Sequence, residues 1–352
     1  MLRVGVIGCG KLAREVHLPL LARRAEIIAL ADPSEAALAA AAPLAPRAEL
    51  CEKASELLAF RPDAVVIGTP SGLHAAIALQ AVAAGIPFYL EKPISINLAE
   101  ARRLLAAVGE QEVSAVVGFN LRFHPLYQEA SHLIERGAIG RVIGARTVFT
   151  SDTPLPSWKE ARSTGGGALL DLFSHDADIL ACLLAEPVES VSAQAATRSS
   201  EDDTAWVECR FADGVVTQSF VAFGAPSQAT IEIYGDRGRL FIDRYSGLGV
   251  RHVAGARGPL GELAGAVREF LNGLPYLRAK SVAPWHDPSY APALESFLTC
   301  VRDRRVPRPS LHDGMASLAV VLAAEESART GRPVAVPTPR TSIGSSAEEA
   351  AQ

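Results

Sequence analysis

The feature that most constrains the fold of this chain is an alternation, over residues 1–120, of short apolar runs with windows rich in alanine and leucine. Such an alternation is typical of βαβ units built around a parallel sheet. Several of the apolar runs lack polar alternation, as expected for strands that helices cover on both faces. The predicted strands are residues 3–8, 27–31, 64–69, 88–91 and 115–119. The sequence therefore predicts an α/β fold that begins with a doubly wound parallel sheet.

After residue 120 the pattern changes. A helical window at 126–136 precedes a strand at 142–150, and residues 206–211 then show period-two alternation. Turn sequences at 213–214 and 235–238 separate further runs of this kind, which favours a mainly antiparallel sheet. One face of that sheet should pack on helices. The other face, if it carries apolar residues, would be a surface for self-association.

The chain length, the change of pattern after residue 120 and the composition of the last residues together predict the domain boundaries. A chain of 352 residues exceeds the size at which one hydrophobic core keeps growing. We predict a first domain over residues 1–120 and a second α/β domain over residues 121–336. The second includes helices at 290–301 and 312–329, and the latter is expected to pack back on the first domain. Residues 337–352 are rich in Ser, Thr, Ala and Glu and are expected to form a flexible tail.

Composition argues against several classes of function. The net charge of -5 argues against nucleic-acid binding. Five widely spaced cysteines without a C-x-x-C pair indicate neither a disulfide framework nor a zinc site, and they favour a reducing, cytoplasmic location. Met1 leads directly into the first strand, so no secretory signal is expected. The longest mostly apolar stretch, residues 75–90, is interrupted by Gln80, Gly85 and Pro87, and we predict no membrane span.

A glycine-rich turn follows the first predicted strand, with the sequence Gly8-Cys9-Gly10-Lys11-Leu12-Ala13. In such a G-x-G-x-x-A turn the first glycine permits the tight bend, and the second lets the backbone approach a pyrophosphate. The following helix would direct its N-terminal amides at the phosphates. We predict that Gly8, Gly10, Lys11 and Leu12 bind a dinucleotide, and a purely structural turn is the alternative.

Asp32 ends the second predicted strand, in the region past the turn where a carboxylate can accept the ribose 2'-hydroxyl of a dinucleotide. A carboxylate at this position repels a 2'-phosphate. The next residues, Pro33 and Ser34, offer no cation for such a phosphate, so NAD is favoured over NADP as the cofactor. Asp32 could also serve as a helix N-cap.

Other polar residues lie at the carboxyl ends of the predicted strands, where ligands bind in sheets of this kind. They are Thr69, Pro70, Glu91, Lys92 and Asn120, and His74 follows in the next helical turn. Lys92 ends an apolar strand and precedes Pro93, so partial desolvation should lower its pKa toward the range useful for proton transfer. An ion pair with Glu91 is the alternative, but neighbours on a strand point to opposite faces. His74 could equally be a hydrogen-bonded structural residue.

Asp171, His175 and Asp178 are spaced to share one stripe of a helix, which a glycine-rich turn at 165–167 opens. Carboxylates that flank a histidine are costly to bury, which favours a functional role. A metal site is the alternative. The sequence offers no third ligand with clear geometry, however, and we predict no metal.

In combination these motifs resemble the Gfo/Idh/MocA family, which includes glucose-fructose oxidoreductase and inositol dehydrogenase. The resemblance spans roughly residues 2–336, and its motifs are GCGKLA at 8–13, TP-x-x-x-H at 69–74, EKP at 91–93, GFN-x-RF at 118–123, GGG-x-x-x-D-x-x-x-H at 165–175 and DG-x-x-SL at 313–318. It implies a Rossmann domain followed by an α/β domain whose open sheet builds homodimers or homotetramers.

The resemblance also implies site residues. Lys92, Asp171 and His175 would form the catalytic group, with Glu91 and Asn120 near the nicotinamide. The residues implied around the substrate are Arg122, Trp158 and Arg162, together with Asp171 and His175. Where this chain has Phe173 the family commonly has glycine, and the ring could narrow the sugar pocket or fill the core.

The predicted reaction is hydride transfer between NAD(P) and a secondary alcohol or ketone of a sugar or cyclic polyol. His175 is the predicted general base, Lys92 would stabilise the alkoxide, and Asp171 would orient its partners. Because coupled groups titrate as a set, whether Lys92 or His175 moves the proton stays open. The alternatives are an NAD-dependent glycosidase that uses transient oxidation and a dinucleotide-sensing protein without catalysis.

Overall fold

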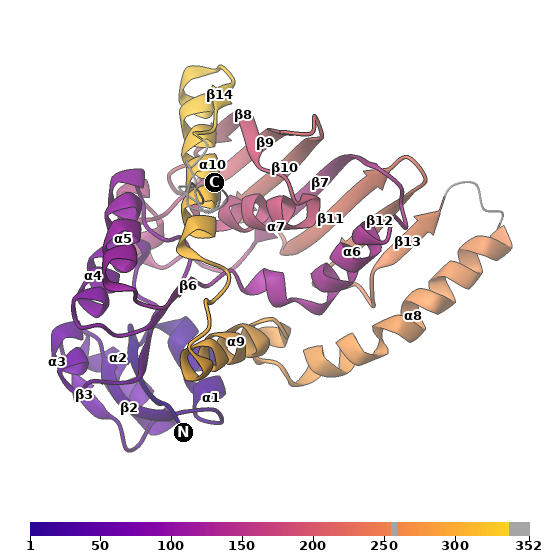
Figure 1. Cartoon of the computed structure of the whole chain (residues 1–352). Helices are drawn as coiled ribbons and strands as arrows, with labels where there is room; N and C mark the ends of the chain where they lie inside the picture. The colour runs from indigo at the N-terminus through magenta and orange to yellow at the C-terminus, as the bar shows by residue number, and fades with distance from the viewer. Residues whose placement is uncertain (255–258, 338–352) are drawn as a thin grey trace, which may run out of the picture.

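The structure is a computed structural model in which residues 1–254 and 259–337 are described, and it contains two sheets with helices around them (Figure 1). The first sheet has six parallel strands in the order β3-β2-β1-β4-β5-β6. They are β1 Arg3–Ile7, β2 Glu26–Ala31, β3 Glu49–Cys51, β4 Ala64–Ile67, β5 Phe88–Leu90 and β6 Ala115–Val117. The predicted doubly wound parallel sheet is confirmed. Strand β3 was not predicted from the sequence. Two of its three residues are exposed, so the strand has no apolar run that would indicate it.

Helices and short turns connect these strands. Strands β4, β5 and β6 consist of buried residues, which is why the sheet needs cover on both faces. Side-chain oxygens of Ser34 and Asn97 accept backbone hydrogen bonds and so begin α2 and α5. With η marking a single 3-10 or π-helical turn, the connections are η1 Ala13–His17, α1 Leu18–Leu21, α2 Glu35–Ala41, η2 Ala42–Leu44, α3 Ala54–Ala59, η3 Ser71–Leu73, α4 His74–Ala83 and α5 Leu98–Gln111.

The second sheet has eight strands in the order β13-β12-β11-β7-β10-β9-β8-β14. All neighbours pair antiparallel except β7 and β10, which confirms the predicted mainly antiparallel open sheet. From Ala205 to Phe211 in β9, every second residue is buried and the residues between them are exposed, as the period-two pattern predicts. The strands are β7 Val142–Ser151, β8 Val188–Ala196, β9 Thr204–Phe211, β10 Val216–Phe223, β11 Gln228–Gly235, β12 Gly238–Asp243, β13 Arg251–Ala254 and β14 Val334–Ala335.

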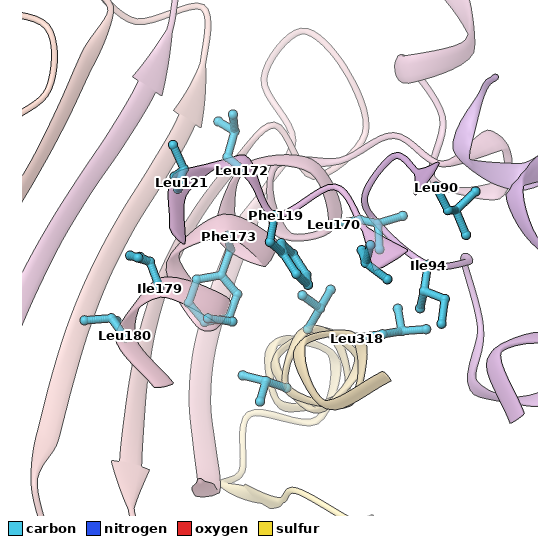
Figure 2. Close-up of a cluster of buried hydrophobic side chains, with 14 of the residues drawn as sticks. Leu90, Ile94, Phe119, Leu121, Leu170, Leu172, Phe173, Ile179, Leu180 and Leu318 are labelled. Atoms are coloured by element: carbon cyan, nitrogen blue, oxygen red, sulfur yellow. The ribbon is translucent and has the colours of Figure 1, made fainter. Parts of the chain in front are cut away.

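Helices α7 and α10 lie on the second sheet, and α10 also contacts α5 and β6 of the first sheet (Figure 1). Figure 2 shows the buried side chains at this junction, among them Phe119, Phe173 and Leu318. Phe173 is fully buried there, so its ring fills the core. The remaining elements are η4 Asn120–Phe123, α6 Pro125–Glu135, η5 Ser157–Lys159, η6 Arg162–Thr164, η7 Leu169–Phe173, α7 Ser174–Leu184, α8 Pro259–Val282, η8 Pro284–His286, α9 Tyr290–Asp303 and α10 Leu311–Thr330.

Helix α8 is the largest departure from the sequence-based prediction, which assigned no element to residues 259–282 (Figure 1). Its sequence contains three glycines and Pro275. These residues disfavour the interior of a helix, so the sequence did not indicate a helix here. Within the described ranges, no helix is long and apolar enough to cross a membrane. The predicted tail falls outside the described residues except for Pro337, and the predicted domain boundaries stay predictions.

Candidate active site

The candidate active site lies where the loop after β5 meets η7, a π-helical turn at the start of α7. Lys92 Nζ donates to Asp171 twice, to the carboxylate Oδ1 and to the backbone carbonyl, each at 2.8 Å. π-helical turns of this kind are frequent at functional sites. Because an ammonium group has three hydrogens, these two bonds leave Lys92 one donor for a ligand.

A second lysine meets the same carboxylate. Lys159 Nζ lies 2.6 Å from Asp171 Oδ2 and 5.2 Å from the centroid of the Trp158 ring. The loop that carries Lys159 packs tightly on the glycine turn at 165–167. A Cβ added at Gly166 would clash with the Lys159 carbonyl oxygen. Thr164 Oγ1 donates to the Trp158 carbonyl at 2.6 Å, a further contact within this loop. Asp171 therefore bridges two lysines from different segments of the chain.

His175, the third member of the predicted catalytic group, packs on Phe149 with the ring centroids 5.9 Å apart. Its Nδ1 is buried and has no hydrogen-bond partner in the described part of the chain. Arg244 lies over the same phenyl ring, 5.0 Å from its centroid, and pairs with Asp287 at 3.2 Å. His175 thus has an unused ring nitrogen, and the positive charges of Lys92, Lys159 and Arg244 all act on it.

These charges and the burial of the site shift its pKa values, as is common at functional sites. Burial by itself would raise the pKa of Asp171, but Lys159 and Lys92 outweigh it and hold that pKa well below its usual range. Burial lowers the pKa of Lys92, and the Asp171 charge opposes this effect. Burial, and next the charge of Lys92, lower the pKa of His175 well below 6.5. At neutral pH the site therefore holds a carboxylate and a neutral imidazole.

The fingerprint turn has the form that a bound dinucleotide requires. Gly8 has a φ of +94°, and a Cβ there would lie 2.6 Å from the Gly68 carbonyl oxygen, so only glycine fits. A Cβ at Gly10 would meet nothing within 4 Å, which leaves the approach to the turn open for a pyrophosphate. Thr69 Oγ1, beside this turn, is buried without a partner among the described residues. A diphosphate would fit these features.

Asp32 and Glu91 bind protein groups near this turn. Asp32 accepts hydrogen bonds from the backbone N–H groups of Cys9 and Ser34, both at 2.8 Å, so its carboxylate lies beside the fingerprint. Glu91 Oε1 lies 2.9 Å from His17 Nε2, in a buried pair that joins the end of β5 to η1. The alternative ion pair between Glu91 and Lys92 is therefore not formed, since each has another partner.

His74 and Asn120, also predicted to border the cofactor, tie segments of the protein together. The ring nitrogens of the buried His74 lie 2.6 Å from the Pro93 carbonyl oxygen and 2.8 Å from the Thr69 carbonyl oxygen. His74 thus links the Thr69 loop to the segment that carries Lys92, which corresponds to the structural alternative. Asn120 Nδ2 donates to Ser289 Oγ at 2.7 Å. Direct contact of either residue with the cofactor stays a prediction.

A segment from the C-terminal half contacts the fingerprint turn and the helical turn η1 that follows it. Trp285 Nε1 donates to Glu15 Oε2 at 2.6 Å, and Lys11 Nζ lies 5.8 Å from the indole centroid. Trp285 has a φ of +54°, a backbone conformation that few non-glycine residues adopt. The pair of Asp287 with Arg244 anchors the segment two residues further on. Trp285 therefore lies at the edge of the predicted cofactor site.

The structure places two of the implied substrate residues, Arg122 and Arg162, in ion pairs with carboxylates other than Asp171. Arg122 pairs with Asp178 at 2.6 Å and with Asp313 at 3.0 Å. Arg162 pairs with Glu325 at 2.5 Å and so joins the loop before the glycine turn to α10. Their role at the substrate stays a prediction, whereas Trp158 lies beside Lys159 in the cluster itself.

The prediction that Asp178 shares one stripe of a helix with Asp171 and His175 is wrong. The π-helical turn at Leu169–Phe173 changes the register between Asp171 and the rest of α7. As a result Asp171 turns to the two lysines, while Asp178 faces Arg122.

Sequence reasoning missed Lys159, Arg244 and Trp285. Lys159 follows the implied substrate residue Trp158 directly, and this adjacency was an available signal. Trp285 lies between two prolines in Pro-Trp-His-Asp-Pro, which indicates an irregular segment but not what it contacts. No local pattern singles out Arg244.

Comparisons with known proteins agree with the two-sheet architecture. Residues 2–119 match a family model described as "Oxidoreductase family, NAD-binding Rossmann fold", and residues 127–241 match the "GFO/IDH/MocA C-terminal domain". Inositol 2-dehydrogenase of Rhizobium meliloti is 27% identical over 95% of this chain and 99% of the relative. For 1,5-anhydro-D-fructose reductase of Ensifer adhaerens the identity is 29%, over 96% and 99% of the two chains.

Among solved structures, GenD2 from gentamicin A biosynthesis, in complex with NAD, superposes with a TM-score of 0.80. It is 28% identical, and the match covers 96% of this chain and 97% of that one. The likeness therefore extends over both sheets and the elements that join them.

Proposed function

Because the chain belongs to the Gfo/Idh/MocA family of NAD-binding oxidoreductases, we propose that it transfers a hydride between NAD and a secondary alcohol or ketone of a sugar or cyclic polyol. The observation that carries this proposal is the double hydrogen bond from Lys92 to Asp171 in the setting of His175. Oxidation of an alcohol needs a group that takes the hydroxyl proton and a donor that stabilises the developing alkoxide.

In this proposal His175 takes the hydroxyl proton during oxidation. Burial and the Lys92 charge lower its pKa, so the imidazole is neutral and ready to accept. Lys92 donates its remaining hydrogen to the alkoxide oxygen, and Asp171 keeps the ammonium group charged and in place. In the reverse direction His175 returns the proton to the carbonyl oxygen. Positioning of this kind can supply about 7–11 kcal/mol of the barrier reduction.

The residues that would hold the cofactor are Gly8 and Gly10 at the diphosphate and Asp32 at the adenosine ribose. When bound, NAD supplies the nicotinamide that accepts or gives the hydride. Asp32 supports the preference for NAD, because its carboxylate would repel the 2'-phosphate of NADP.

A substrate screen tests the proposal. Purified protein is mixed with NAD or NADP and a panel of cyclic polyols, sugars, aminosugars and nucleotide sugars, and NADH absorbance is followed. We expect reduction of NAD with at least one member and its loss in Lys92→Met. Binding of NAD without any reduction across the panel would favour the dinucleotide-sensing alternative. Hydrolysis of glycosides without net NADH would favour the glycosidase.

We also propose that the chain forms a homodimer or homotetramer through the outer face of the second sheet. Trp206 of β9 is 47% exposed and lies 5.1 Å, centroid to centroid, from Phe220 of β10. Contiguous exposed apolar surface marks contact sites between proteins, and this aromatic pair would form the centre of such a surface. Light scattering of the purified protein, with Trp206→Glu as the disrupting variant, measures the assembly, and a monomeric unmodified chain would contradict it. A cytoplasmic location stays a prediction from cysteine spacing.

A further inference from the structure

We propose, building on the function above, that the substrate carries an anionic group, a carboxylate or a phosphate, and that Lys159 binds it. The basis is a shared carboxylate at the centre of the site. Two ammonium groups, those of Lys92 and Lys159, share the single carboxylate of Asp171. The following geometry indicates that the second lysine has unused binding capacity.

Lys159 retains hydrogen-bond donors. Within the described ranges its Nζ has one acceptor, Asp171 Oδ2 at 2.6 Å, so two of its three ammonium hydrogens are available to a ligand. Its side chain is 23% exposed, so a ligand from solvent can reach it. The neighbouring Trp158 ring and the tight packing at Gly166 restrict where the ammonium group can move. Lys159 is thus a cation held in place with donors to spare.

Among the described residues, the one ion-pair partner of Lys159 is Asp171, which Lys92 also contacts. The charged side chains that act on His175 are those of Lys92, Arg244, Asp171 and Lys159. Arg244 has its own counter-ion in Asp287, and Lys92 is balanced by Asp171. The Glu91 carboxylate also acts on Lys92, but from beyond hydrogen-bond distance, so Lys92 and Lys159 share the Asp171 carboxylate as the acidic group that both contact. An anion on the substrate would give Lys159 a charged acceptor that it does not share with Lys92.

The placement of the two lysines defines the class of substrate. Lys92 lies on Oδ1 and Lys159 on Oδ2 of one carboxylate, so a group bound by Lys159 lies next to the hydroxyl that Lys92 would bind. The substrate is then a sugar or cyclic polyol whose acidic group is close to the carbon that is oxidised. A uronic acid and a sugar phosphate both have this chemistry. A lysine that only held Asp171 would affect neutral and acidic substrates alike.

The test compares matched pairs of neutral and acidic ligands on the full chain saturated with NADH. Calorimetry measures binding of glucose against glucuronate, galactose against galacturonate, and glucose against glucose 6-phosphate. Turnover of the same compounds is measured with NAD. The variants are Lys159→Gln, the charge-conserving Lys159→Arg and, as a matched loss of one positive charge far from the site, Arg329→Gln, which removes an exposed cation of α10.

We expect the unmodified chain to bind at least one acid about tenfold or more tightly than its neutral partner, in line with a charge-assisted hydrogen bond. Lys159→Gln should abolish this preference, while Lys159→Arg and Arg329→Gln should keep it. The pair that shows the preference identifies the anion as carboxylate or phosphate. Equal binding within every pair, or a preference that survives in Lys159→Gln, would overturn the inference.

Failure of the proposed function would look different. If neutral sugars reduce NAD and the acids have no advantage, the oxidoreductase function stands and only the anionic substrate is wrong. If the acids bind through Lys159 but no compound reduces NAD, the binding inference stands and the proposed reaction loses its support.

Discussion

Lys92 is joined to Asp171 through two acceptors of that one residue, the carboxylate oxygen Oδ1 and the backbone carbonyl oxygen, both at 2.8 Å. Two fixed acceptors allow the ammonium group little freedom to rotate or move away. The carbonyl belongs to a π-helical turn and also accepts from Ser174 Oγ at 3.2 Å. The position of Lys92 is therefore set by the backbone of η7 as well as by an ion pair.

Replacing Lys92 by methionine should lower turnover strongly and leave NAD affinity nearly unchanged. The variant removes the alkoxide donor, an effect of the order of 10²–10³ for the loss of one such group, while the turn at Gly8 and Gly10 is untouched. Turnover under saturating NAD and calorimetric binding of NADH measure the two effects. A large loss of NADH affinity with turnover of the bound complex preserved would contradict the assigned role.

The pH profile of oxidation should have its acid limb below the ordinary histidine value. Burial and the Lys92 charge lower the pKa of His175 from 6.5, so the imidazole keeps its neutral, proton-accepting form to lower pH. The kcat/KM profile of the unmodified chain measures this limb. In Lys92→Met the neighbouring cation is gone, and the residual activity should show the limb at higher pH. A limb that does not move between the two proteins would remove His175 as the titrating base.

Phe173→Leu should reduce stability without changing substrate affinity. The ring is fully buried in the junction between the two sheets and α10, so the smaller side chain leaves unfilled space (Figure 2). A loss of about 1–3 kcal/mol in unfolding free energy is expected for a core change of this size. Urea unfolding and KM are the two measurements. A changed KM with unchanged unfolding would instead indicate that the ring lines the substrate pocket.

Asp176→Asn should become more stable than the unmodified chain as pH rises. Burial raises the pKa of Asp176 from 3.8 to about 7, and the hydrogen bond from Thr147 opposes the shift only in part. Between these two values the folded state binds more protons than the unfolded state, so the stability of the unmodified chain falls with rising pH. Asparagine carries no such penalty.

Unfolding midpoints at pH values of about 5 and about 8 test the effect of Asp176→Asn. The stability difference between variant and unmodified chain should grow over that interval by about 3 kcal/mol, since about two pH units lie between the lower pH and the folded-state pKa of about 7, and one pKa unit corresponds to about 1.4 kcal/mol. Asp213→Asn, at an exposed turn, is the control and should show no such growth. A constant difference for Asp176→Asn would mean that the carboxyl is already ionised at the lower pH.

Trp285→Phe should lower the energy transfer from tryptophan to bound NADH more than Trp206→Phe does, and Trp158 beside Lys159 should supply part of the transfer that remains. The chain has three tryptophans, and Trp285 lies beside Lys11 and Glu15 at the fingerprint turn, whereas Trp206 is on the outer face of β9. Energy transfer falls steeply with distance. Sensitised NADH emission measures it, with Trp206→Phe as the control. Loss of the signal in the control and its retention in Trp285→Phe would place the cofactor elsewhere.

Local pattern was sufficient for the architecture and for part of the site. Apolar runs of strand length predicted five of the six strands of the first sheet, and period-two alternation predicted the antiparallel one. The motifs selected Lys92 and Asp171, which the fold brings into contact from positions 79 residues apart. Such features are readable because burial and turn formation impose them on consecutive residues.

What lies around that pair was decided by tertiary structure. Lys159 reaches Asp171 because its loop packs on Gly166, and Trp285 reaches Glu15 across 270 residues of sequence. Asp178 left the predicted stripe because a single π-helical turn changed the helical register. Such contacts form when separate segments pack against each other in three dimensions. The periodicity and spacing of residues within one segment do not show which distant segment it will contact, so these contacts could not be predicted from the sequence.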